Sequence, residues 1–304
     1  MTLVVEQLLN GVQLGVMLFL LAAGLTLVFG VMGIINLAHG SLYMIGAYAA
    51  AIVAERSGST ALALVAGLGA AAAFGVLVEI AVLRRLYARD HLDQVLATFA
   101  LILFVNQATA MLFGRQPIFV AVPSLLQGSI EPIPGLTYPV FRIAVIVVGI
   151  VVAIGLYVLI NKTRIGMLVR AGATHRQMVR ALGVDVRLLF TAVFGLGALL
   201  AGLAGVMAGP ILAVQVGMGE QILILTFVVM VIGGVGSVRG ALLGALMVGI
   251  VDTLMRAFMP GLLRGLMAGA DADALAAGLS SMGIYLLMAI VLLVRPRGLF
   301  PAHA

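Results

Sequence analysis

The sequence has 304 residues, of which 63% are hydrophobic and only 9% are charged. Because a soluble domain carries about 25% charged residues, this composition excludes a secreted, cytosolic or nucleic-acid-binding globule. The long unbroken apolar runs favour helices over a barrel, and the 38 glycines favour close helix packing in lipid. We therefore expect an all-α integral membrane protein whose residues 1–304 form a single transmembrane domain. The absence of cysteine excludes disulfides and thiolate metal sites.

Candidate membrane spans follow one another along the whole chain, since a bilayer core of about 30 Å needs about 20 apolar residues. The second candidate span follows the first without a polar loop, and the seventh is short. We expect each of these two to be either a full crossing or a broken, re-entrant helix. The pattern predicts a bundle of eight or nine transmembrane helices at 8–30, 32–54, 61–83, 95–113, 140–160, 189–209, 221–236, 240–258 and 279–294.

Basic residues between the spans predict the orientation of the bundle. Twelve of them fall on one side if nine spans alternate, and five fall on the other. The side with twelve holds Arg84, Arg85, Arg89, Arg239, Arg295, Arg297 and the six basic residues of 162–188. By the positive-inside rule this side is cytoplasmic. We therefore expect the N-terminus on the outer side of the membrane and the C-terminus on the cytoplasmic side.

The most distinctive segment joins the first two candidate spans and carries glycines together with polar residues. Polar groups at membrane depth cost several kcal/mol when they have no partner. The segment is either a tight helix crossing or a discontinuous helix lining a polar pathway. Its candidate pathway residues are Gly33, Asn36, His39, Gly40 and Ser41.

A second glycine-rich segment lies in the other half of the chain, where Gly233, Gly234, Gly236 and Ser237 follow the seventh span. Interrupted segments in corresponding positions of two halves are typical of inverted-repeat transporters. The sequence therefore predicts two glycine-broken segments that form an inverted repeat, and these four residues as further pathway candidates.

Two acids lie within predicted spans. Glu79 is close to the end of the third span, so we expect it to reach the interface. Asp252 is expected near the midplane, where an acid is either a proton-coupling group or a structural partner. Arg256 follows four residues later on the same helical face, and we favour the structural pair.

The 162–188 segment predicts a short basic amphipathic helix that Gly183 ends. It is either a helix at the lipid surface or a docking helix for a cytoplasmic partner, with Arg170, Arg176, Arg180 and Gly183 as the candidate coupling residues. The chain has no phosphate-binding glycine loop, no zinc motif and no nucleophile elbow. We expect no enzyme activity, no catalytic residue, no metal and no cofactor.

Several motifs resemble one known family, the permease subunits of bacterial branched-chain amino acid ABC importers. The resemblance rests on Gly33-Ile-Ile-Asn-Leu-Ala-His-Gly40, on Tyr43-Met-Ile-Gly-Ala-Tyr48, on Gly233-Gly-Val-Gly-Ser237 and on Arg295-Pro-Arg-Gly-Leu-Phe-Pro301. It implies a second permease subunit, two cytoplasmic ATP-binding subunits and a periplasmic solute-binding protein as partners, with 170–187 as the coupling element. Members often have Glu where this chain has Ser41.

The sequence thus predicts one transmembrane subunit of an ATP-driven importer that contacts membrane lipid and no nucleic acid. Branched-chain or other aliphatic amino acids are the expected solutes. Urea, short amides or aromatic acids are alternatives that the resemblance also allows. The alternative from another class is a proton- or sodium-coupled secondary transporter that works alone and uses Asp252.

Overall fold

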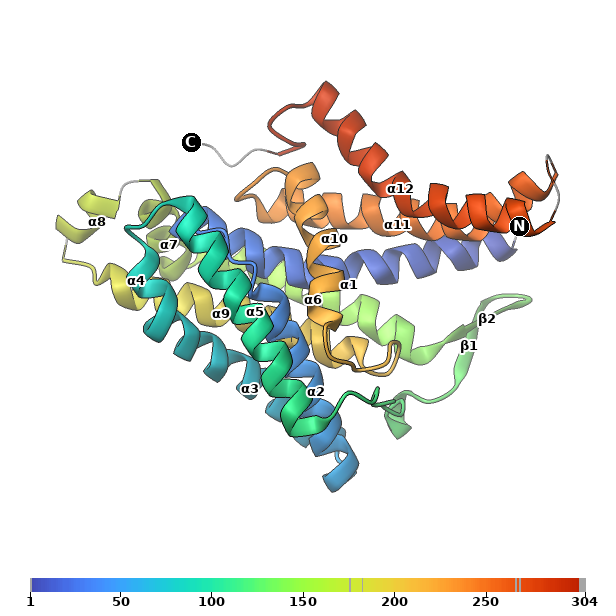
Figure 1. The fold of residues 1–304 in the computed structure, drawn as a ribbon, viewed down its shortest axis with the longest axis horizontal. Helices are drawn as coiled ribbons and strands as arrows, with labels where there is room; N and C mark the ends of the chain where they lie inside the picture. The colour runs from blue at the N-terminus through green and yellow to red at the C-terminus, as the bar shows by residue number, and fades with distance from the viewer. Residues whose placement is uncertain (1, 175, 182, 266, 268, 301–304) are drawn as a thin grey trace.

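A computed structural model describes the protein except for residues 1, 175, 182, 266, 268 and 301–304 (Figure 1). The described chain is a helical bundle with one short β-hairpin, formed by β1 (Ser129–Ile133) and antiparallel β2 (Leu136–Pro139). A 3₁₀ turn, η2 (Ser124–Leu126), precedes the hairpin, and a π-helical turn, η1 (Glu79–Leu83), joins two helices. The α-helices are α1 (Thr2–Met32), α2 (His39–Ser57), α3 (Thr60–Val78), α4 (Arg84–Leu86), α5 (His91–Phe113), α6 (Val140–Lys162), α7 (Arg164–Thr174), α8 (Arg176–Ala181), α9 (Val186–Ala208), α10 (Met218–Gly233), α11 (Val238–Arg264) and α12 (Gly269–Val294).

Seven helical segments within the described residues are long and apolar enough to cross a membrane. They are α1, the continuous stretch Thr60–Leu86, α5, α6, α9, α11 and α12. The nine predicted spans therefore correspond to seven long segments and two shorter helices, α2 and α10. For these two segments the sequence did not decide between a full membrane crossing and a re-entrant helix. In the structure each of the two helices begins inside the bundle.

Helix α1 forms the centre of the bundle, and most of its length is buried. Glycines let its neighbours approach at backbone distance, since a Cβ on Gly15 would come within 2.8 Å of the Ala245 carbonyl oxygen on α11. Gly24 of α1 meets Gly197 of α9 in the same way. The small residues predicted from composition thus provide the contacts that hold the long helices together.

The predicted basic segments gather at one end of the bundle, which we call the basic end. Arg84 of α4 contacts Thr191 of α9 there. Arg170, Arg239 and Arg295 line one common cavity at the same end. The other end carries the hairpin and the start of α1, where Tyr138 and Arg142 both donate to Asn10 Oδ1.

The element order α1–α2–α3 recurs as α9–α10–α11. In each triplet a long helix is followed by an irregular segment, a shorter helix and a second long helix. The irregular segment of the second triplet spans 209–217, before α10. The expected pairing of 33–41 with 233–237 is therefore wrong in its second half, because 233–237 forms the tight turn after α10.

Candidate functional site

The break between α1 and α2 returns the chain to the interior of the bundle. Gly33 adopts a φ of 67°, which a residue with a side chain rarely takes, and α1 ends there. His39 Nε2 then lies 3.2 Å from the carbonyl oxygen of Leu21, eleven residues before the end of α1. At 1.5 Å per residue this is about 16 Å from the basic end, about half of a bilayer core of about 30 Å. Helix α2 therefore begins near the middle of the membrane.

Buried polar atoms without partners are concentrated around this break. Asn36 Oδ1 accepts a hydrogen bond from the backbone N–H of Ala38 at 3.1 Å, but Asn36 Nδ2 has no partner within the described residues. His39 Nδ1 and Thr26 Oγ1 are also buried without a described partner. The other buried polar atoms without a described partner belong to Tyr48, Gln94 and Ser280. Ser41 is buried in the first turn of α2.

The N-termini of α2 and α10 meet at this depth. A Cβ on Gly40 would lie 2.3 Å from the Gly219 carbonyl oxygen. A Cβ on Gly219 would lie 2.2 Å from the Gly40 carbonyl oxygen. From this contact α2 and α10 run in opposite directions (Figure 1). The C-terminal carbonyls of α10 accept from Leu299 and Phe300 at the basic end. Two helix N-termini, each with partial positive charge, thus converge near the membrane centre.

The acid Glu220 lies beside this junction, in the first turn of α10. Asn106 of α5 donates a hydrogen bond to its carboxylate. The Glu220 side chain is exposed on the surface of the bundle at the depth of Gly219. Sequence reasoning missed Glu220 because the residues before Gln221 were assigned to a connection outside the membrane. It missed Asn106 because an amide within the apolar span 95–113 is not by itself a signal of a site. The pair of glycines at 217 and 219, followed by an acid, was the available signal.

The second predicted glycine cluster lies elsewhere. Gly233 packs against Gly240, and Gly234 has a φ of 102° in the turn between α10 and α11. The Ser237 hydroxyl caps α11 by accepting from the Gly240 N–H at 3.1 Å. Gly236 lies against Gly30 near the end of α1. These residues are therefore at the basic end and not beside Asn36 and His39.

A cavity of about 1650 Å³ opens at the basic end. Three of the predicted pathway residues line it, Gly33, Gly236 and Ser237, together with Arg170 from the predicted coupling group. The remaining pathway candidates, Asn36, His39, Gly40, Ser41, Gly233 and Gly234, are packed within the protein and do not line it.

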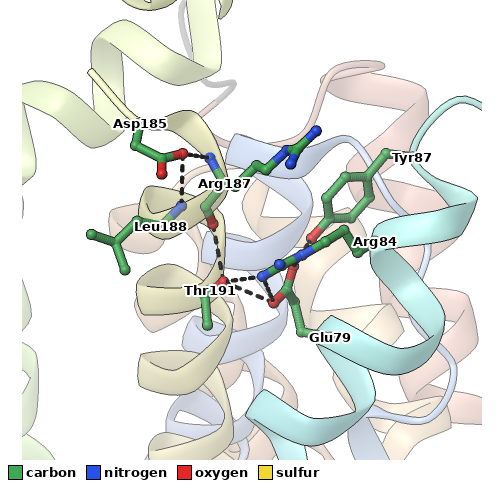
Figure 2. A network of polar contacts seen from close by, with 7 residues as sticks. All are labelled: Glu79, Arg84, Tyr87, Asp185, Arg187, Leu188 and Thr191. Carbon is green, nitrogen blue, oxygen red and sulfur yellow. Dashed lines mark hydrogen bonds and ion pairs between the residues drawn. The ribbon is translucent and has the colours of Figure 1, made fainter. Parts of the chain in front are cut away.

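A buried polar network, which we call the clamp, joins the end of α3 to α9 (Figure 2). The carboxylate of Glu79, with 0% exposure, accepts from Arg84 Nε at 3.2 Å, Arg84 Nη2 at 2.9 Å, Tyr87 Oη at 2.5 Å and Thr191 Oγ1 at 2.8 Å. The expectation that Glu79 reaches the interface is therefore wrong. The π-helical turn that begins at Glu79 shifts the register, and π-turns are frequent at functional positions.

The predicted coupling helix is present as α7 and α8, on either side of His175, which lies outside the described residues. Gly183 ends it as predicted. Its φ is 82°, its N–H bonds the Arg180 carbonyl at 3.0 Å, and the Val184 N–H bonds the Val179 carbonyl at 3.3 Å. This is the Schellman arrangement that favours glycine. Arg180 is exposed, whereas Arg170 bonds the Ile160 carbonyl. Arg176 lies at the start of α8.

The predicted pairing of Asp252 with Arg256 is confirmed, since Arg256 Nε lies 2.9 Å from both carboxylate oxygens. Asp252 lies near the middle of α11, fourteen residues after Val238 and twelve before Arg264. The neighbouring Ile250 contacts Gly11, ten residues before Leu21 on α1 and about 15 Å farther from the basic end.

These features define a multi-pass helical membrane protein with two shorter helices that meet inside it. Residues 7–292 match the family model described as "Branched-chain amino acid transport system / permease component", and the chain belongs to this family. It is 31% identical over 252 residues to the permease protein BraD of Pseudomonas aeruginosa, covering 78% of this chain and 81% of the relative.

Two further relatives extend the comparison. The chain is 29% identical to LivH of Escherichia coli K12, covering 78% of this chain and 81% of the relative, and 27% identical to a probable LivH of Methanocaldococcus jannaschii, covering 75% and 73%. All three names describe branched-chain amino acid transport permeases. No solved structure matches the chain. The protein is a permease component of an ABC transporter.

Proposed function

We propose that this permease forms part of an ATP-driven importer for branched-chain or other aliphatic amino acids, in the inner membrane of a bacterium. Its partners would be a second permease subunit, two cytoplasmic ATP-binding subunits and a periplasmic solute-binding protein. The relatives support the solute class. The basic end supports an orientation with this end in the cytoplasm and the N-terminus in the periplasm.

The meeting of the α2 and α10 N-termini beside Glu220 is the observation that carries this proposal. An amino acid is a zwitterion, and helix N-termini favour its carboxylate. The Glu220 carboxylate favours its ammonium group, and the unpaired amide of Asn36 adds a hydrogen-bond donor. A small opening between Gly40 and Gly219 would admit the solute to these groups.

The surface that carries Glu220 supports the presence of a second permease. An acid at the centre of a membrane helix costs about 3 kcal/mol when it faces lipid. Glu220 is exposed on the isolated chain at this depth. We therefore place the second permease subunit against the α5 and α10 surface, with the solute pathway between the two subunits.

The function is tested by uptake into membrane vesicles. We expect labelled leucine to accumulate only when ATP, the ATP-binding subunits and the solute-binding protein are all present. The reason is that the chain has no nucleotide-binding loop of its own. Accumulation by this subunit alone, driven by a proton or sodium gradient, would contradict the proposal, and labelled urea is the matched alternative solute.

Glu220→Gln is expected to lower leucine uptake at least about tenfold, because the side chain keeps its size and loses its attraction for an ammonium group; each factor of ten corresponds to about 1.4 kcal/mol. Glu55→Gln, an exposed acid near the end of α2, serves as the control. Uptake is measured in the complete transporter at matched expression. Equal rates for Glu220→Gln and Glu55→Gln would remove Glu220 from the pathway.

The double variant Arg176→Glu/Arg180→Glu is expected to weaken binding of the ATP-binding subunits and to leave membrane insertion intact. Two charge reversals at a protein contact can cost several kcal/mol, whereas at a lipid surface each removed basic residue costs about 1 kcal/mol. Co-purification across a range of salt concentrations measures the difference. An unchanged complex with normal uptake would make α7 and α8 lipid-surface helices.

The clamp supports the coupling role of this segment. Asp185, which lies four residues after the end of α8, caps α9 by accepting from the N–H groups of Arg187 and Leu188 (Figure 2). Thr191, one turn farther along α9, is bonded to Glu79. A push on α8 would therefore reach α3 and α9 as one unit, and α9 contacts α2 through Gly202.

A further inference from the structure

The cavity at the basic end combines apolar walls with an arginine mouth. Phe19 and Leu27 of α1 and Ala153 and Ile154 of α6 form the walls. Arg170, Arg239 and Arg295 also line the cavity, and because all three are exposed we place them at its mouth. No Asp or Glu is among the described residues that line the cavity. The salt bridges of the described part of the chain lie outside the cavity, at Glu79, Asp252 and Asp273.

The depth of the cavity corresponds to one leaflet of a bilayer. Phe19 lies thirteen residues before Met32 at the end of α1, about 20 Å at 1.5 Å per residue. Ala153 lies nine residues before the end of α6, about 14 Å. Half of a bilayer core is about 15 Å thick. The apolar walls thus extend over the length that an acyl chain covers in one leaflet.

The volume of the cavity exceeds that of the usual pocket for a small ligand. Pockets for small ligands usually measure about 300–1,000 Å³, whereas this cavity measures about 1650 Å³. Helix α6, which forms one wall, exposes apolar side chains such as Val147, Ile150 and Val151 on its remaining surface. The cavity therefore lies beside a surface that faces lipid, from which an amphiphile can enter.

The charges at the mouth favour a phosphate group. Arginine binds phosphate through parallel N–H donors, and the three guanidinium groups have no described acid to compete. Arg239 lies over the Tyr157 ring at 5.1 Å, which holds it at the edge of the cavity. Arg170 uses one nitrogen on the Ile160 carbonyl and keeps other donors available.

We propose that this cavity binds one anionic phospholipid, with its acyl chains between α1 and α6 and its phosphate against Arg170, Arg239 and Arg295. This site is distinct from the junction of α2 and α10. A helix of a partner protein is less compatible, because the mouth would demand an acidic partner surface in place of the anionic lipid that surrounds the protein.

The test uses the full chain, purified in detergent and freed of lipid, with bound lipid counted by native mass spectrometry. Dioleoyl phosphatidylglycerol is expected to bind at least about tenfold more tightly than dioleoyl phosphatidylcholine, since each basic residue contributes roughly fivefold. The triple variant Arg170→Gln/Arg239→Gln/Arg295→Gln is expected to reduce this ratio to about threefold or less. The control Arg85→Gln/Arg89→Gln/Arg164→Gln removes three exposed arginines from the same end and should keep the ratio.

Three further measurements can overturn the proposal. Ala153→Trp fills the apolar part of the cavity and should weaken phosphatidylglycerol binding; no effect, together with full competition by millimolar inorganic phosphate, would leave only a simple anion site. Equal binding of the two lipids, or an equal loss in the control triple variant, would also contradict it. Loss of the bound lipid on assembly with the partner subunits would show that a protein occupies the cavity, and its displacement by leucine would make it a solute vestibule.

Discussion

Gly40→Ala and Gly219→Ala are each expected to destabilise the protein by about 3 kcal/mol, the upper part of the range for overpacking. The added methyl group would lie 2.3 Å or 2.2 Å from a backbone carbonyl oxygen of the opposite helix. Because backbone cannot move aside as the end of a flexible side chain can, the two helix N-termini must separate. Thermal unfolding of the purified chain in detergent measures the loss.

Gly69→Ala and Gly155→Ala are the matched controls, since each lies in a helix and a Cβ would meet nothing within 4 Å. Alanine is favoured over glycine in helices, so we expect these variants to be as stable as the parent. If all four variants melt at the same temperature, then α2 and α10 do not meet as closely as the structure describes.

Arg84→Met is expected to cost about 3 kcal/mol, because it leaves the buried carboxylate of Glu79 without its counter-ion. Tyr87 and Thr191 continue to donate to this carboxylate, which limits the loss to the lower part of the range of 3–5 kcal/mol for breaking buried pairs. The Arg84 side chain is 32% exposed, which also reduces the effect. Thermal unfolding again provides the measurement.

Two companion variants separate the ion pair from general effects of charge. Arg85→Met changes an exposed neighbour and should leave the melting temperature unchanged. The double variant Glu79→Met/Arg84→Met removes both charges and should recover part of the stability, because no unpaired carboxylate remains. A double variant less stable than Arg84→Met would show that hydrogen bonds to Glu79, and not charge pairing, hold the clamp together.

The helical segments were predictable because their information is local. A run of about 20 apolar residues needs no tertiary contact to identify it, and all seven long segments within the described residues correspond to predicted spans. The pairing of Asp252 with Arg256 was predictable for the same reason, because four residues along a helix bring two side chains to one face. Gly183 was recognisable as a helix end from its position alone.

The depth of each side chain within the membrane was not predictable, because it depends on which helices pack together. The sequence left open whether the segment 33–41 is a tight helix crossing or a discontinuous helix, and only the contact of His39 with Leu21 shows that the chain returns to the interior of the bundle. Glycine enrichment directed attention to 233–237, whereas Gly219 lies opposite Gly40 through a contact across 179 residues. Local sequence alone does not specify such a contact, because many glycines lie among similar apolar neighbours.

The sequence by itself thus determined the class of protein, its helical segments, its asymmetry of charge and its family resemblance, all of which depend on composition and short spacing. Only the tertiary structure decided that Glu79 is buried in the clamp and that Glu220 lies beside two converging helix N-termini. The physical reason is that burial and partner choice follow from packing between distant helices, where backbone contacts at small residues fix depth and register.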